Sequence, residues 1–126
     1  MNKKLQAALD QIDERLLKGD ITNFKIGKTR NAEERFVAED YDDYALASII
    51  AFSKNAKEID MAEKDLIDYY KKHKILSEKC ENENLGGGNP DATYVYIIAK
   101  SLNADYVDRL IGKKLVLSKD FVPIEL

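Results

Sequence analysis

Apolar residues recur at steps of three and four near the start of the chain. Between residues 3 and 18 this spacing places one apolar face along a helix, formed by Leu5, Ala8, Leu9, Ile12 and Leu16. Gly19 follows directly and is typical of a helix end. We therefore predict an amphipathic helix over residues 3–18, with its charged face in solvent.

The next stretch changes to a period of two. Phe24 and Ile26 are apolar and Lys25 between them is charged, which is the pattern of a half-buried strand. We predict a strand over residues 21–26 that ends at Gly27.

A short helix is predicted directly after this strand. Asn31 and Glu34 have the spacing of a capping box, in which Asn31 accepts from a first-turn amide and Glu34 reaches back. This helix is expected to cover residues 31–38. Four basic residues are then brought near its positive end, where an anion can bind: Lys25, Lys28, Arg30 and Arg35. The alternative interpretation is a basic turn in solvent.

Three later stretches are predicted as strands. Residues 44–52 are nearly uncharged and indicate a buried strand, although so short a run also fits a helix. Residues 93–99 are rich in aromatic and β-branched side chains, with Tyr94 and Tyr96 on one face. Residues 114–117 are predicted as a last short strand.

The predicted helix over residues 56–73 carries a carboxylate on its apolar face. Its apolar stripe consists of Ile59, Ala62, Leu66, Ile67 and Tyr70. Glu63 falls inside this stripe, where an acid must be paired, protonated or bound to a cation. Two interpretations stand side by side: an ion pair with Arg35 or a lysine that serves packing, and a functional site.

Three smaller features complete the pattern. Residues 81–91 form a glycine-rich loop, which either connects elements or approaches a ligand with an amide from Asn82, Asn84 or Asn89. Basic residues at 71–74 are expected to cap the end of the preceding helix. A short helix is predicted over residues 103–111.

Composition limits the class of protein. The chain has 126 residues, and we expect a single domain over 1–126, without a signal peptide or membrane span and located in the cytoplasm. The lone Cys80 and His73 belong to no metal-ligand cluster. The net charge of −3 is unusual for a protein that binds nucleic acid unaided, so such contact is expected to be local or helped by a protein partner.

Gly27, Arg35 and Glu63, with the Lys-Ile-Gly sequence that ends at Gly27, resemble the GIY-YIG nuclease superfamily, in particular its phage-type branch. The resemblance covers about residues 21–89. It implies an Mg²⁺ ion held by Glu63, a phosphate gripped by Arg35, and tyrosines that position the attacking water. An asparagine among Asn82, Asn84 and Asn89 is expected to belong to the same site.

The chain departs from the family pattern at three points. A helix and a short connection stand where the family has its first strand and tyrosine, Lys25 replaces the tyrosine of the second motif, and Glu39 replaces a histidine or tyrosine. Residues 93–99 resemble the missing strand and can complete the sheet as a circular permutation, with Tyr94 or Tyr96 as the phenol. The alternative is an ordinary core strand.

We expect an α+β fold with a small mixed sheet flanked by helices, in which the helix 3–18 precedes a core of about 21–118. The first hypothesis is an Mg²⁺-dependent endonuclease, acting on DNA in particular. Its catalytic residues would be Arg35, Glu63, Tyr96 and Tyr94, and its substrate-binding residues Lys25, Gly27, Lys28, Arg30, Asn84 and Asn89. The second hypothesis is a GIY-YIG-like binding or protein-interaction module without enzymatic activity. A third is an adaptor that docks a partner on the apolar stripe of residues 3–18.

Overall fold

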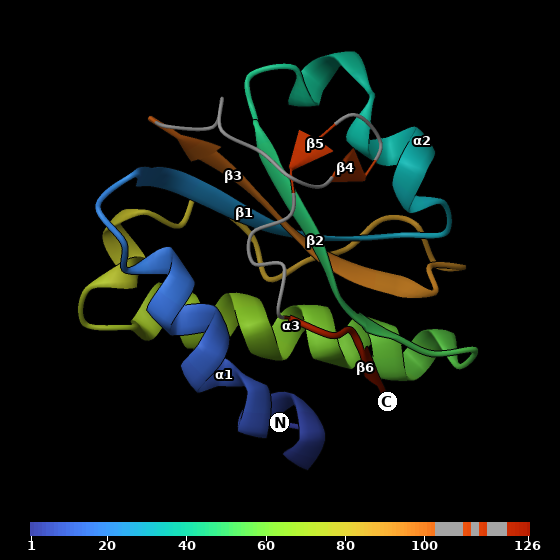
Figure 1. Ribbon diagram of the computed structural model, residues 1–126. Coiled ribbons are helices and arrows are strands. Elements are labelled where there is room, and N and C mark those ends of the chain that lie inside the picture. The colour runs from blue at the N-terminus through green and yellow to red at the C-terminus, as the bar shows by residue number, and fades with distance from the viewer. Residues whose placement is uncertain (103–109, 112–113, 116–120) are drawn as a thin grey trace.

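The computed structural model describes residues 1–102, 110–111, 114–115 and 121–126 (Figure 1). Its helices are α1 (Lys3–Leu16), α2 (Ala32–Phe36) and α3 (Ala56–Lys72), with two short 3₁₀ helices, η1 (Glu39–Tyr41) and η2 (Leu76–Glu78). Its strands are β1 (Ile21–Thr29), β2 (Leu46–Phe52), β3 (Tyr94–Ser101), β4 (Leu110–Ile111), β5 (Lys114–Leu115) and β6 (Ile124–Glu125).

The strands form one mixed sheet in the order β1-β3-β2-β5-β4, with β6 paired to β2. β3 lies between β1 and β2 and is antiparallel to both, whereas β5 and β6 are parallel to β2. The central place of β3 explains its content of valine, isoleucine and tyrosine, because both of its faces are covered. The prediction of an α+β fold with a small mixed sheet is confirmed.

Each face of the sheet carries its own apolar core. α1 and α3 lie together on one face, and α2 lies on the other (Figure 1). Val95, Ile97 and Ala99 of β3 belong to the core under α1 and α3. Tyr96 and Ile98, which alternate with them, belong to the core that includes Phe36 of α2. The period-two pattern of β3 thus divides its side chains between two cores.

The predicted apolar stripe of the first helix is buried inside the protein. Leu5, Leu9, Ile12 and Leu16 of α1 are all buried, and Asn2 caps the helix by accepting from the amides of Lys4 and Leu5. The prediction of an amphipathic helix is confirmed. The adaptor hypothesis is wrong in the form stated, because the stripe is already covered by the chain's own core.

α3 follows its prediction closely, and its stripe is buried together with Glu63. Lys71, near the end of α3, was expected to cap the helix but makes other contacts. Its ammonium donates to the carbonyls of Asn82 (2.7 Å) and Glu83 (2.9 Å), so it holds the following loop in place of capping the helix.

The C-terminal part of the sheet differs from the predictions. Leu110–Ile111 form strand β4, so the helix predicted over 103–111 is wrong at that end, and its residues 103–109 lie outside the described part of the chain. The strand predicted at 114–117 is found as Lys114–Leu115, and 116–117 are likewise not described. β6 was not predicted, because two residues are too few for a periodic pattern.

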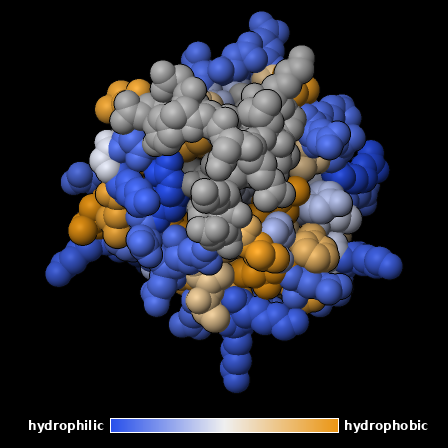
Figure 2. All heavy atoms as spheres, viewed as in Figure 1, coloured by the Kyte–Doolittle hydropathy of each residue, from blue (hydrophilic) through white to orange (hydrophobic). Residues whose placement is uncertain are grey.

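Polar side chains cover most of the coloured surface in Figure 2, with smaller apolar areas between them. The exposed large apolar residues come from different elements and include Val37, Met61, Ile75, Leu85, Leu102 and Val122. Single exposed apolar residues are ordinary on a protein surface. In the described segments, no helix has the length and apolar character needed to cross a membrane.

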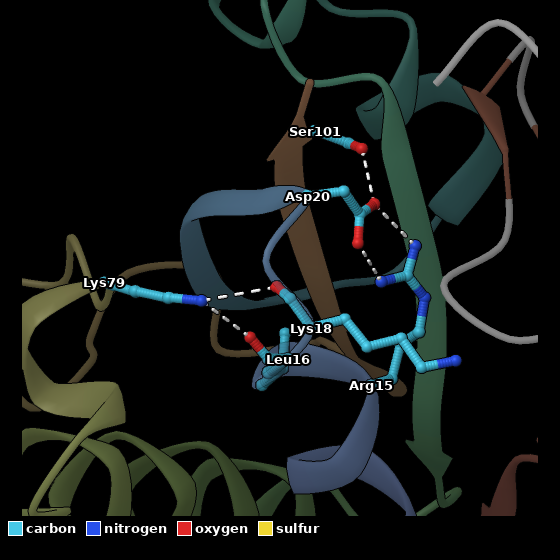
Figure 3. Close-up of polar contacts among 6 residues, drawn as sticks. All are labelled: Arg15, Leu16, Lys18, Asp20, Lys79 and Ser101. Carbon is cyan, nitrogen blue, oxygen red and sulfur yellow. Dashed lines mark hydrogen bonds and ion pairs between the residues drawn. The ribbon is translucent and has the colours of Figure 1, made fainter. Parts of the chain in front are cut away.

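Asp20 joins the end of α1 to two strands of the sheet (Figure 3). Arg15 donates to both carboxylate oxygens of Asp20, at 3.0 and 3.1 Å, and the Ser101 hydroxyl donates to one of them at 2.7 Å. Lys79 donates in the same region to the carbonyls of Leu16 and Lys18. The entry to β1 is therefore fixed by polar contacts on both sides.

Asp20→Asn is expected to lower the free energy of unfolding by about 1–3 kcal/mol at neutral pH, because a charged acceptor of three hydrogen bonds is lost. Burial opposes ionisation of Asp20, but the hydrogen bonds from Arg15 and Ser101 outweigh it and lower its pKa. A lowered pKa stabilises the folded state above the unfolded-state pKa, and this contribution is lost as the pH falls through the folded-state pKa. Urea unfolding from neutral pH downward should therefore show the wild type and variant converging, with the exposed Asp10→Asn as control.

Candidate functional site

A hollow of about 830 Å³ opens beside β1. Its walls come from β1, α2, η1, the middle of α3, the loop after η2, and β3. Most of the predicted site residues line it: Lys25, Gly27, Lys28, Arg35, Glu63, Asn84, Asn89 and Tyr96. Residues that are distant in the sequence are thus brought to one concave surface, the usual form of a small-molecule or catalytic site.

Two predicted residues lie elsewhere. Arg30 lines a smaller neighbouring hollow with Asn31 and Glu34, because β1 ends at Thr29 and the chain turns there. Tyr94, at the start of β3, lines a third hollow next to Phe52 and Leu126. The structure therefore favours Tyr96 over Tyr94 as the phenol of the main hollow.

Gly27 makes room for Tyr96. The two residues face each other in the β1–β3 register, so the late strand lies against residues 21–27, an adjacency that the sequence left open. A Cβ atom on Gly27 would lie 2.3 Å from the Tyr96 hydroxyl and 2.4 Å from Cζ of its ring. The Phe36 ring packs edge-on against Tyr96 at 5.3 Å between centroids. The glycine of the motif is thus required by a side chain of the neighbouring strand.

The helix that carries Arg35 begins as predicted, with one difference. The Asn31 side chain accepts from the Glu34 amide at 3.1 Å, which is half of a capping box. The Glu34 carboxylate accepts from the Asn31 side-chain amide at 3.4 Å, because the Asn31 backbone N–H already donates to Thr29 Oγ1. α2 has only five residues, so its N-terminus is not an anion site by itself.

The Arg35 guanidinium is held from two sides. It donates to both oxygens of the Asp40 carboxylate, at 2.9 and 3.0 Å, and lies over the Tyr41 ring at 4.0 Å from its centroid. The planar guanidinium binds a carboxylate through two parallel hydrogen bonds, and the same geometry suits two oxygens of a phosphate. The predicted pair between Arg35 and Glu63 is not formed among the described residues.

Tyr41 and Tyr96 share a buried hydrogen bond between their hydroxyls at 2.6 Å. Burial and the neighbouring Tyr41 raise the pKa of Tyr96, and Arg35 offsets this only in part. Tyr96 is therefore a neutral phenol near pH 7, able to donate or accept a hydrogen bond but not to serve as a phenolate base. Sequence reasoning missed Tyr41, whose only signal is its place six residues after Arg35.

Glu63 is 4% exposed and reaches the hollow from α3. Its Oε1 lies 4.0 Å from the Lys28 ammonium and 3.4 Å from the Gly87 N–H. Burial raises the pKa of Glu63, while Lys28 and the Gly87 N–H lower it by less. The partner on β1 is therefore a lysine, one of the two alternatives that the sequence left open.

The glycine-rich loop closes over this carboxylate. A Cβ atom on Gly86 would lie 2.3 Å from Glu63 Oε1, and its φ of +96° is unfavourable for other residues. A side chain at position 86 would require the Glu63 carboxylate to shift. The backbone of the loop thus lies close to the Glu63 carboxylate, and its approach to a ligand stays a prediction.

Asn82 fastens the same loop to β1. Its side-chain amide accepts from the Ile26 N–H and donates to the Ile26 carbonyl, both at 2.8 Å. Asn82 therefore uses its amide on the strand, while Asn84 and Asn89 are exposed at the rim of the hollow. Sequence reasoning also missed Glu81, which accepts from the Tyr44 hydroxyl at 2.8 Å.

The atoms of the hollow that could coordinate a metal ion suit only a weakly held, hard cation. In the part of the chain that the structure describes, no three or more histidine, cysteine, aspartate or glutamate residues form a metal cluster. Glu63 Oε2 accepts no hydrogen bond from the described residues. A single carboxylate beside an open hollow fits Mg²⁺, which keeps several waters and takes its other ligands from a substrate phosphate. It does not fit zinc or calcium sites, which need more protein ligands.

Comparisons of the chain with protein-family models, with curated proteins and with solved structures give no match. The function is therefore inferred from the hollow itself and from the sequence pattern around Gly27.

Proposed function

We propose that the protein is an Mg²⁺-dependent endonuclease with a GIY-YIG-like site. The observation that carries the proposal is the shared hollow, which a guanidinium (Arg35), a buried carboxylate (Glu63) and a phenol (Tyr96) line together. This combination suits phosphodiester cleavage, because the substrate is an anion that gains charge in the transition state.

Each residue has a distinct role. Glu63 would hold Mg²⁺, which when bound polarises the scissile phosphate and stabilises the leaving oxygen. Arg35 offsets the charge that develops on the phosphate, with Lys25 nearby on β1 as a further cation. The neutral Tyr96 orients the attacking water by a hydrogen bond, and Tyr41 fixes the direction of its hydroxyl.

A permuted chain order explains the departures from the family pattern. β3 pairs antiparallel with β1 and brings Tyr96 opposite Gly27, where the family's first strand is expected to lie. Tyr41 adds a phenol beside Tyr96, in the same hollow as Lys25, which stands in place of the family's second tyrosine. We infer that residues 94–101 take the part of the missing first strand.

A cleavage assay on supercoiled plasmid and on single-stranded RNA tests this proposal. We expect cleavage in the presence of Mg²⁺ or Mn²⁺, none in EDTA, and loss of cleavage in Glu63→Gln. Glu58→Gln is the matched control, because Glu58 is an exposed acid on the same helix and outside the hollow. Metal-dependent cleavage that survives in Glu63→Gln would contradict the role of Glu63.

A second candidate is a binding module without chemistry, which one observation favours. Arg35 pairs with Asp40 and Lys28 pairs with Asp60, so two cations of the hollow already have acidic partners without a ligand. For this candidate, a folded wild-type protein would cleave neither substrate under any metal condition. It would still bind DNA, through a few phosphate contacts and with a shallow dependence on salt, given its net charge of −3.

A further inference from the structure

Lys28 is a buried ammonium that faces two acids of α3. Its side chain is only 5% exposed, and its Nζ lies 2.8 Å from Asp60 Oδ1 and 4.0 Å from Glu63 Oε1. Asp60 and Glu63 are three residues apart on the helix, so their side chains lie on neighbouring positions of one surface. One cation is thus placed between two candidate partners.

The two distances show which acid holds the lysine. The contact with Asp60 is a short hydrogen bond, whereas 4.0 Å to Glu63 is too long for one. Asp60 also pairs through its other oxygen with Lys64 at 3.0 Å, which fixes its position along the helix. The charge of Lys28 is therefore neutralised mainly at Asp60, and Lys28 forms no hydrogen bond with Glu63 Oε1.

We propose that Asp60 is a positioning residue that holds Lys28 away from Glu63 and so reserves the Glu63 carboxylate for a divalent cation. The inference rests on the proposed function, because it assumes that Glu63 takes Mg²⁺. Without Asp60, the buried ammonium has Glu63 as its remaining acidic partner at close range. Lys28 then competes directly with the metal ion.

Asp60 would also attract a nearby Mg²⁺ ion directly, by its own negative charge and independently of Lys28. A double-mutant cycle separates the two effects, since an action through Lys28 disappears when Lys28 is absent. Mg²⁺ binding to the full chain is measured by titration calorimetry and by the rise in melting temperature with Mg²⁺. The variants are Asp60→Asn, Lys28→Met, the double variant and Glu63→Gln.

We expect Asp60→Asn to weaken Mg²⁺ binding by about fivefold or more and Lys28→Met to leave it equal or tighter. In the Lys28→Met background, Asp60→Asn should then have no effect. Asp68→Asn is the control, because Asp68 also pairs with a lysine four residues later, at 2.9 Å, whereas Lys28 pairs with Asp60. Circular dichroism confirms folding, and Asp60→Glu, which keeps the charge, should bind Mg²⁺ better than Asp60→Asn.

Two results would overturn the inference. If Asp60→Asn weakens binding equally with and without Lys28, Asp60 acts through space, and the proposed nuclease function is unaffected. If wild type and Glu63→Gln bind Mg²⁺ equally, Glu63 is not the metal ligand, and the metal-dependent function fails together with this inference.

Discussion

Gly27→Ala is expected to lower the free energy of unfolding by about 1–3 kcal/mol or more, the usual cost of forcing extra volume into a packed core. The added Cβ would lie 2.3 Å from the Tyr96 hydroxyl and 2.4 Å from Cζ. These atoms belong to a rigid ring that Phe36 packs against and that Tyr41 binds through its hydroxyl. Because Phe36 and Tyr41 hold the ring, the added Cβ must either displace Tyr96 from these contacts or push β1 and β3 apart.

Urea unfolding measures this cost, and Gly19→Ala is the control. Nothing lies within 4 Å of a Cβ built on Gly19, so its replacement should change stability little. A second comparison tests the cause: in a Tyr96→Ala background, which removes the ring, adding Gly27→Ala should cost much less than in the wild type. Equal costs for Gly27→Ala and Gly19→Ala would show that Tyr96 does not occupy the space above Gly27.

If the protein is the proposed endonuclease, Arg35→Lys is expected to slow cleavage by about a hundred- to a thousandfold, the typical loss when one preorganised group that stabilises transition-state charge is removed. Lysine keeps the positive charge, but its ammonium cannot donate two parallel hydrogen bonds as the planar guanidinium does. The Asp40 carboxylate, which now accepts from both outer nitrogens, would also hold an ammonium less well. The loss should appear in the rate constant of cleavage under substrate saturation.

Arg15→Lys is the matched control for this variant. Arg15 forms the same kind of bidentate ion pair with Asp20, at 3.0 and 3.1 Å (Figure 3). This pair lies at the end of α1, outside the hollow. Its replacement should lower stability and leave the cleavage rate close to that of the wild type. A rate for Arg35→Lys within a few fold of the wild type would remove Arg35 from the proposed chemistry.

The helices whose formation depends on residues close together in the sequence were predictable from it. The burial of Glu63 followed from the stripe of α3, because helical periodicity alone decides which side chains face inward. The start of α2 at Asn31 followed from capping chemistry between neighbours. β4 and β6 were not predictable, since strands of two residues exist only through their partners in the sheet.

The partners within the site depend on contacts across the fold. Spacing in the sequence could not show whether Tyr94 or Tyr96 belongs to the site. The β1–β3 register favours Tyr96, because it places Tyr96 opposite Gly27. Spacing also suggested Arg35 as one partner for Glu63, whereas in the structure Arg35 pairs with Asp40. The cation near Glu63 is Lys28, which itself pairs with Asp60. Such choices depend on how a strand, a short helix and a loop meet, which no local pattern contains.

The loop fastened by Asn82 has a consequence for the solution behaviour of the sheet. β1 is the outermost strand in the order of the sheet, and an outer strand with free backbone groups can pair with another molecule and begin aggregation. Here the Phe24 N–H and carbonyl are bonded to Lys79 and Glu81, and the Asn82 amide satisfies Ile26 as a strand would. The segment after η2, which lines the hollow, thereby also covers the backbone of β1 at Phe24 and Ile26.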